Sequence, residues 1–381
     1  MNDFIFQNPT KLIFGKNTIS ALTTEIPFGK KILVTFGGGS VKKNGVYDQV
    51  TDALKGFDFT EFWGIEPNPT VETLRKAIKI VKEQKCDFIL AVGGGSVIDG
   101  SKLIAAAALI DEDAWDLVRN PALYKGALPL ATVLTLPATG SEMNRGAVIS
   151  NHTLKEKFSL YSNYPMFSIL DPQVTYTLPQ YQIACGLADT FVHVIEQYLT
   201  TTGQSPLMDR WAEGIMQTVV EIAPEIKDGR HDYEEMSTFM LSATMALNGF
   251  VAMGVTQDWA THMIGHEISA IHNITHGNTL AIILQGTMWV MRDEKGDKII
   301  QLGRRIWGIT DPDRDNAIKK TIECTEDFFR SLGLKTRLGE NGIGEDTINE
   351  IVRRFKIRDV HYGENGTVDA EKTREILEYV R

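Results

Sequence analysis

The first half of the chain alternates short apolar runs with amphipathic stretches. Residues 31–36, 87–92 and 130–137 are rich in β-branched residues and are bounded by Gly or Pro, which is typical of buried strands. Between the first and the second of these runs, residues 71–85 carry apolar side chains at helical spacing, starting at Val71. Strands that alternate with helices predict a parallel sheet with crossover helices.

The pattern changes at residues 171–182, which hold two prolines and little periodicity. Beyond them the apolar residues recur at spacings of three and four, and no strand-like run stands out. We therefore predict an α/β domain over residues 1–178 and an all-helical domain over residues 179–381. The length of 381 residues agrees with two domains of ordinary size.

Composition narrows the class of protein. Hydrophobic residues make up 43% of the chain and charged residues 23%, as in an ordinary globular protein with ample core. The net charge of -10 argues against a nucleic-acid partner. No membrane span or signal peptide is expected, because no apolar run is long enough. Three scattered cysteines outside any zinc or redox motif predict free thiols in a cytoplasmic protein.

A glycine-rich turn follows the second predicted strand, at Gly93, Gly94, Gly95 and Ser96. A helix is expected to start near residue 97, so its free N–H groups would face a pyrophosphate that the glycines allow to approach. Asp99, on the first turns of this helix, is a candidate to bond a ribose or an amide. The turn does not match the standard Rossmann fingerprint, and a tight turn without ligand is the alternative.

A similar turn follows the first predicted strand, at Gly37, Gly38, Gly39 and Ser40. Lys42 and Lys43 come next, and the first carboxylate is Asp48. A carboxylate near this point favours NAD, whereas hydroxyl and ammonium groups suit the 2′-phosphate of NADP. The turn therefore favours NADP(H), although surface lysines are usually only solvated.

A third polar turn spans residues 135–144. Its Thr135, Thr139 and Ser141 could offer hydroxyls to a cofactor, but capping of a helix explains the hydroxyls and Glu142 equally well.

Four of the eight histidines lie within residues 258–277, at 262, 266, 272 and 276. The zinc-protease motif HExxH is absent, because Ala270 stands where its second histidine would be. His262 and His266 share a helix face, and His272 and His276 would do so only if the helix continued. Residues 272–277 instead resemble a helix-to-loop break, so the four imidazoles need not converge.

Asp189 and His193 form a second doublet, four residues apart among apolar residues. Such polar groups are expensive to bury unless they find a partner. A satisfied core pair is the ordinary explanation of one doublet. Two doublets beside a nucleotide-binding pattern favour a metal site.

Several stretches taken together resemble the iron-containing (group III) alcohol dehydrogenases, in particular their NADP-dependent butanol dehydrogenase and aldehyde reductase branch. The resemblance covers essentially the whole chain and implies an N-terminal dinucleotide-binding domain of dehydroquinate synthase type with a helical metal-binding domain. The stretches are residues 93–102, 135–144, 169–199, 258–282, 302–310 and 362–369.

The resemblance also implies roles for single residues. It makes Asp189, His193, His262 and His276 the ligands of one divalent metal. His266 is similar to a family histidine near the nicotinamide, where it is expected to handle a proton, and His272 has no ligand role.

Two further residues bear on the cofactor. Lys155 matches a family lysine that touches the ribose, and Gly38 stands where NAD-using members carry Asp, which favours NADP(H). Three imidazoles and one carboxylate suit Zn or Fe(II) and leave an open position for substrate.

The expected function is reversible hydride transfer between NADPH and a short-chain aldehyde. Apolar residues near the histidines suit a small uncharged substrate: Phe250, Met253, Trp259 and Met263. A polyol dehydrogenase that uses NAD and a non-catalytic nucleotide-binding protein are the alternatives. A homodimer is expected, with residues 4–7 as an edge strand that could pair with a second copy.

Overall fold

The computed structural model describes residues 1–227, 229 and 231–381. They form two compact units. The sheet unit contains Gln7–Pro179 and the described part of Arg230–Thr244, and the helical unit contains Met1–Phe6, Gln180–Gly229 and Met245–Arg381.

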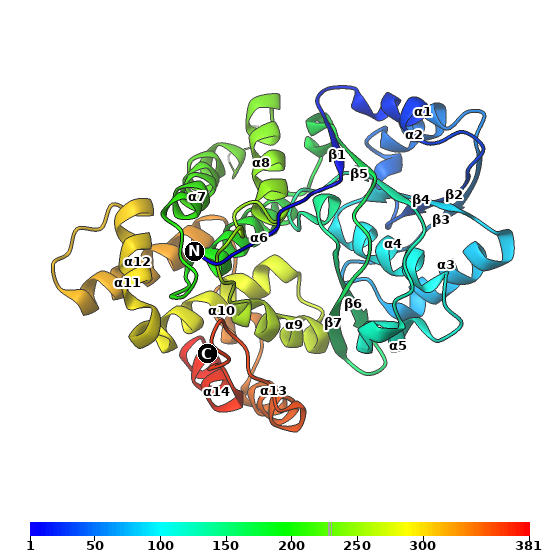
Figure 1. Cartoon of the computed structure of the whole chain (residues 1–381). Helices are drawn as coiled ribbons and strands as arrows, with labels where there is room; N and C mark the ends of the chain where they lie inside the picture. Colours follow the sequence, from blue (N-terminus) through cyan, green and yellow to red (C-terminus); the bar gives the residue numbers. More distant parts are fainter. Residues whose placement is uncertain (228, 230) are drawn as a thin grey trace. The chain divides into compact units, whose positions relative to one another are not determined.

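A six-stranded sheet forms the centre of the sheet unit, and Figure 1 labels five of its strands. The strand order is β1-β8-β5-β4-β2-β3. Every neighbouring pair in it is parallel, which confirms the predicted parallel sheet. The strands are β1 (Lys11–Phe14), β2 (Lys31–Phe36), β3 (Asp58–Phe62), β4 (Phe88–Gly93), β5 (Leu130–Leu134) and β8 (Phe167–Leu170). A separate antiparallel pair, β6 (Gly146–Asn151) with β7 (Glu156–Tyr161), was not expected from the sequence.

Both faces of this sheet are buried, because successive side chains of a strand point to opposite sides. In β2, Leu33 belongs to one core cluster, while Ile32 and Val34 belong to the other. The helices of the unit are α1 (Leu22–Glu25), α2 (Val46–Ala53), α3 (Val71–Gln84), α4 (Gly95–Ala107), α5 (Ala114–Arg119) and most of α8 (Tyr233–Ala246). Side chains of α3 and α4 fill the first cluster and those of α2 the second.

The helical unit contains no β-strand among the residues described, apart from a single bridge between Tyr362 and Val368. This confirms the expected helical second half. Its helices are α6 (Gln180–Tyr198), α7 (Pro206–Lys227), α9 (Ala260–His272), α10 (His276–Val290), α11 (Arg292–Ile306), α12 (Arg314–Ser331), α13 (Glu345–Arg358) and α14 (Ala370–Tyr379). Within the described ranges, none of the helices combines the length and the apolar character needed to span a bilayer.

The compact units differ from the predicted ranges 1–178 and 179–381 in two segments. The first residues join the helical unit, where the N–H of Asn2 donates to the carbonyl of Gly254 at 2.8 Å. Most of α8 joins the sheet unit, where the Thr244 hydroxyl donates to Glu142 at 2.5 Å. Sequence periodicity cannot show such contacts, because they join residues about 100 or more positions apart.

The chain start also differs from a simple edge strand. Residues 4–7 have no strand partner within the described single chain, and the edge strand is β1, which begins at Lys11 and pairs with β8. Phe4 and Ile5 are exposed, while the ring of Phe6 packs against Phe250. Pairing of residues 4–7 with a second copy stays a prediction.

Candidate metal centre and phosphate-binding turns

Helix α6 carries the first two candidate ligands. Asp189 and His193 are four residues apart and therefore share one helix face. Both are buried, with exposed fractions of 2% and 3%. From Ile183 to Tyr198 the helix is buried on all sides, so its polar side chains must find partners inside the unit.

The segment between α9 and α10 separates the other histidines. Helix α9 ends at His272, and Asn273 follows in the left-handed region with φ 55°. Asn tolerates this conformation better than other non-glycine residues, which explains the stop. The predicted break is confirmed. His276 is then the first residue of the new helix α10, where the sequence had suggested only a loop.

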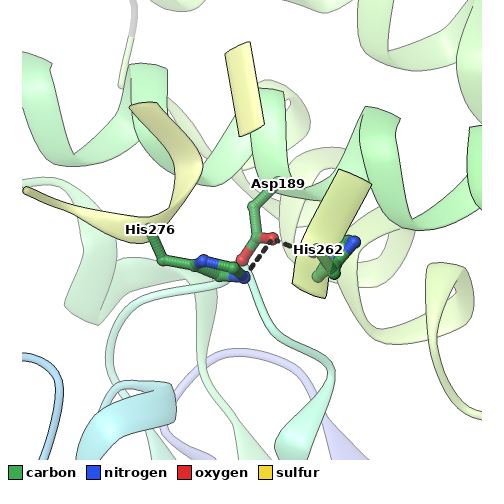
Figure 2. A group of neighbouring side chains, drawn as sticks. All are labelled: Asp189, His262 and His276. Atoms are coloured by element: carbon green, nitrogen blue, oxygen red, sulfur yellow. Dashed lines mark ion pairs between the residues drawn. The ribbon is translucent and has the colours of Figure 1, made fainter. Parts of the chain in front are cut away.

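Three imidazole nitrogens surround one carboxylate oxygen, Oδ1 of Asp189. The Nε2 atoms of His193, His262 and His276 lie 3.5, 3.9 and 3.9 Å from it. Figure 2 shows His262 and His276 on either side of Asp189, and one ligand atom from each of these three lies within 4.8 Å of the others. The ring of His193 stacks on that of His262, with centroids 4.7 Å apart.

This donor set fits a divalent metal. Tetrahedral bonds of zinc to N and O ligands place neighbouring ligand atoms roughly 3.4 Å apart, close to the spacing seen here. The Nε2 atom of His262 is buried and has no hydrogen-bond partner among the described residues, a situation that a bound cation would relieve. Imidazole and carboxylate together suit Zn or Fe(II).

The remaining histidines of the segment separate into two kinds. His266 is buried, and its ring centroid lies 5.0 Å from that of His276 and 6.3 Å from that of His262. His272 is exposed, and its Nε2 lies 2.8 Å from the hydroxyl of Thr347. The structure thus brings His266 beside the candidate ligands and leaves His272 outside the cluster.

Sequence reasoning missed Glu196, a buried carboxylate of α6. It lies three residues after His193 and seven after Asp189, so all three share a helix face, and this spacing could have revealed it. Glu196 contacts Nδ1 of His262, the ring nitrogen on the side away from Asp189.

Trp259 forms one side of the same cluster. Its ring lies edge-on to that of His262, with centroids 5.2 Å apart, and 6.2 Å from that of His193. Its φ of 66° is unusual for a bulky residue, and it is held by the start of α9, where Oδ1 of Asp258 accepts the N–H of Ala260 at 3.0 Å.

The glycine turn of the sheet unit joins β4 to α4. Helix α4 begins at Gly95, two residues earlier than expected, and Ser96 is its second residue. A Cβ at Gly93 would come within 2.5 Å of Val97, and one at Gly95 within 2.3 Å of Thr139. Packing alone therefore requires these glycines. The helix start that they expose fits a bound phosphate, because its first N–H groups lack intrahelical partners.

The side chains of Asp99 and Thr139, which we predicted to contact the cofactor, make hydrogen bonds within the protein. The Asp99 carboxylate accepts the Ser141 hydroxyl at 2.5 Å and the Val148 N–H at 2.9 Å. The Thr139 hydroxyl accepts the N–H of Ser141 at 3.2 Å, whereas the N-cap of the short 3-10 helix that starts at Ser141 is Gly140 and has no side-chain capping bond. Thr135 is buried, and its N–H donates to Gly93.

Lys102 extends from α4 to the turn at residues 135–144. Its ammonium group donates to the carbonyls of Ser141 and Gly146, the Ser141 hydroxyl and the Asn144 amide oxygen, at 2.7 to 3.1 Å. Burial lowers the pKa of Lys102 to about 8, although the carboxylates of Asp99 and Glu142 oppose the shift. Burial raises the pKa of both carboxyl groups.

The turn after β2 has open space around it. A Cβ at Gly38 or Gly39 would meet no atom of the described residues within 4 Å, whereas one at Gly37 would approach the Ile65 carbonyl at 3.3 Å. Ser40 begins a short 3-10 helix that ends at Lys42.

Lys42 lies over two aromatic rings. Its Nζ is 4.0 Å from the centroid of Trp63 and 5.2 Å from that of Tyr47. Glu61 accepts the Trp63 indole N–H at 2.7 Å and the Tyr47 hydroxyl at 2.9 Å, which fixes the two rings. Lys155, by contrast, is exposed in the turn between β6 and β7, with φ 51°.

Comparison with known proteins agrees with this picture. The profile for iron-containing alcohol dehydrogenase matches residues 9–172, and the profile for the C-terminal part of the Fe-containing alcohol dehydrogenase family matches residues 183–379. The chain is 46% identical to the NADPH-dependent aldehyde reductase YqhD of Escherichia coli, over 100% of both chains. It is 42% identical to the probable NADH-dependent butanol dehydrogenase 1 of Bacillus subtilis, over 92% of each.

A solved structure shows the same fold. The crystal structure of Escherichia coli YqhD superposes with a TM-score of 0.98 at 45% identity, covering 100% of this chain and 99% of the other. With both halves matched by family profiles and a relative that is 46% identical over its full length, the chain belongs to the iron-containing alcohol dehydrogenase family.

Proposed function

We propose that this protein is a metal-dependent NADP(H) alcohol dehydrogenase that acts as a reductase of short-chain aldehydes. The reaction converts an aldehyde, NADPH and one proton to an alcohol and NADP⁺, and it is reversible. The observation that carries the proposal is the convergence of three histidine Nε2 atoms on Oδ1 of Asp189. The names of the Escherichia coli and Bacillus subtilis relatives support the aldehyde and alcohol chemistry.

We assign Asp189, His193, His262 and His276 as the ligands of one divalent metal, Zn or Fe(II). When bound, such a metal supplies Lewis-acid polarisation of a carbonyl, and NADPH supplies the hydride. The chain contributes rigid positions for the ligands, because three of the four side chains are buried and His276 is largely so. A fixed site lowers the reorganisation that the reaction would otherwise require.

His266 is our candidate for the general acid that donates a proton to the product oxygen. Two observations support it: the ring is buried, and it lies within 5.0 Å of the His276 ring. An imidazole with this position is suited to general acid and base work. In the reverse direction the imidazole of His266 would accept the proton from the alcohol.

We assign the nucleotide to residues 1–178 and the metal to residues 179–381. The proposed contacts with the cofactor are Gly37, Gly38, Gly39, Ser40, Gly93, Gly94, Gly95, Ser96, Asp99, Thr135, Thr139 and Lys155. Preference for NADPH over NADH is supported by the open space at Gly38 and by Lys42 close behind it. The relatives do not decide this point, since one is named for NADPH and another for NADH.

A cytoplasmic location and a homodimer complete the proposal. The free cysteines Cys86, Cys185 and Cys324 support a reducing compartment. The exposed Phe4 and Ile5 beside the chain start support contact with a second copy.

The test is oxidation of NADPH and of NADH against a panel of short aldehydes. The protein is stripped of metal with a chelator and then assayed alone, with Zn²⁺ and with Fe²⁺. We expect turnover only after metal is restored, and faster turnover with NADPH. Turnover that needs no metal would contradict the metal assignment. A preference for NADH would remove the proposed role of Lys42, and nucleotide binding without turnover on any aldehyde or alcohol would favour a non-catalytic protein.

A further inference from the structure

Glu196 is a charged side chain in the interior of the helical unit, with an exposed fraction of 3%. Its Oε1 accepts the N–H of Thr261 at 2.7 Å, and its Oε2 accepts the N–H of His262 at 3.3 Å. Oε2 also contacts the ring nitrogen Nδ1 of the same histidine. One carboxylate therefore holds both the backbone and the ring of His262.

The backbone contacts explain why a carboxylate is tolerated there. Thr261 and His262 are the second and third residues of α9, whose N-cap, Trp259, makes no side-chain capping bond. Their N–H groups have no partner within the helix, and the positive end of the helix dipole favours an anion. Glu196, from helix α6, thus caps α9 from outside.

The ring contact fixes which nitrogen of His262 carries the hydrogen. A carboxylate can only accept hydrogen bonds, so Nδ1 must be the donor. In a neutral imidazole the other nitrogen, Nε2, then presents its lone pair. That atom is the one 3.9 Å from Oδ1 of Asp189, on the metal side of the ring.

We propose that Glu196 is a positioning residue of the metal centre, which sets the ring orientation and the hydrogen position of His262. The inference rests on the proposed metal site and extends it to a residue that would not itself bind the metal. A hydrogen bond from the second nitrogen of a histidine ligand to a carboxylate both orients the ring and strengthens it as a donor.

A purely structural role would be to cap α9 and nothing more. The two roles predict different results when metal affinity and folding are measured separately. Glu213 provides a matched control, because it is also 3% exposed, lies in the same unit and accepts from the hydroxyl of Tyr198. None of the described contacts of Glu213 involves a histidine of the cluster.

The experiment compares Glu196→Gln with Glu213→Gln in the stripped full-length protein. Affinity for Zn²⁺ is measured by competition with a coloured chelator, the spectrum of bound Co²⁺ is recorded, and thermal unfolding of the metal-free protein reports folding. We expect Glu196→Gln to weaken metal binding roughly 10- to 100-fold and to change the Co²⁺ spectrum. Glu213→Gln should lower the melting temperature while metal affinity stays within about twofold of wild type.

A double variant separates the two roles. If Glu196 acts through His262, then Glu196→Gln should change the residual metal affinity of a His262→Ala protein by less than about twofold. An equal loss in the presence and absence of the His262 ring would overturn the proposal, as would unchanged affinity in Glu196→Gln.

Failure of the proposed function gives another result altogether, because the wild-type protein would then bind neither Zn²⁺ nor Co²⁺. If Glu196→Gln yields too little folded protein, Glu196→Asp replaces it. That variant keeps the charge near the start of α9 but withdraws it from the ring, and the same loss of affinity with the same dependence on His262 is expected.

Discussion

Two buried polar clusters in this protein show how differently a fold can use charge. In the sheet unit, the ammonium group of Lys102 has four oxygen acceptors within 3.1 Å. In the helical unit, three imidazole nitrogens face a single oxygen of Asp189 at 3.5 to 3.9 Å. The first arrangement is complete, since donors meet acceptors. The second gathers imidazole nitrogens and a carboxylate oxygen, which are the ligand atoms that Zn and Fe(II) prefer.

Burial alone therefore does not distinguish a binding site from a structural network. Lys102 connects α4 to the turn after β5 and to β6, because its acceptors come from Ser141, Asn144 and Gly146. Such a network is expected to contribute to folding. Changes to the histidine cluster should therefore reduce catalysis more than stability, whereas changes to the lysine cluster should reduce stability more than catalysis.

The largest effect is expected from the histidine cluster. Replacing His262 or His276 with Ala should reduce kcat by about 10³-fold or more, since Lewis-acid stabilisation of the transition state contributes several kcal/mol. NADPH binding, measured by its fluorescence, should change little. The matched control is His272→Ala, because His272 is exposed and lies outside the cluster. Full activity of a metal-free His262→Ala protein would contradict the metal assignment.

The lysine cluster should respond in the opposite way. Lys102→Met removes the donor from four acceptors and leaves the Asp99 carboxylate buried without its cation. We expect the free energy of unfolding to fall by about 3 kcal/mol, as when one partner of a buried charged pair is removed. Urea titration measures this loss. Zn²⁺ affinity should be unchanged. A loss of metal binding without a loss of stability would contradict the structural role that we assign to Lys102.

The pH dependence of stability provides a smaller test. Burial depresses the pKa of Lys102 from 10.5 to about 8, so between these values the unfolded chain binds more protons than the folded one. Stability from this group therefore rises as pH increases from about 8 to 10.5. Asp99 and Glu142 have the opposite effect at lower pH. Burial raises the pKa of both carboxyl groups, so the folded chain binds more protons than the unfolded one, and their contribution to stability falls as pH increases. Between about pH 8 and 10.5, the free energy of unfolding of the wild type should rise relative to that of Lys102→Met. If the two free energies change with pH in the same way, the lowered pKa of Lys102 is contradicted.

Much of the fold could be predicted from local patterns. The apolar runs at residues 31–36, 87–92 and 130–137 correspond to β2, β4 and β5, because fully buried parallel strands are apolar without interruption. Three strands of the sheet were missed: β1 and β8, which have only four residues each, and the polar β3, since Asp58–Phe62 lacks such a run. Residues 233–246 could be predicted as a helix, but their packing in the sheet unit depends on contacts distant in sequence.

For the candidate site too, local spacing could be predicted from the sequence, whereas contacts between helices could not. The spacing of Asp189 and His193 shows that they share a face, and the break after His272 shows that the later histidines do not form one continuous face. Neither pattern reveals which imidazoles meet, because α6, α9 and α10 converge only through tertiary packing. Glu196 was missed for a further reason: its partner is a ring nitrogen 66 residues away.

The smallest expected effect concerns the nucleotide. Lys42 is exposed, but its ammonium group is held over Trp63 and Tyr47, which Glu61 fixes in turn. A charge-assisted bond to a 2′-phosphate from such a surface position contributes on the order of 1 kcal/mol. We expect Lys42→Ala to raise KM for NADPH about fivefold and to leave KM for NADH nearly unchanged.

Lys43→Ala is the control for this prediction, because the neighbouring lysine carries the same charge and is also exposed. A general electrostatic attraction would make the two variants alike and would weaken both effects equally at high salt. A specific contact predicts that only Lys42→Ala separates NADPH from NADH. If both lysine variants lose the two nucleotides to the same extent, the preference for NADPH has to come from the open backbone at Gly38 instead, and substituting Asp there should then shift the preference toward NADH.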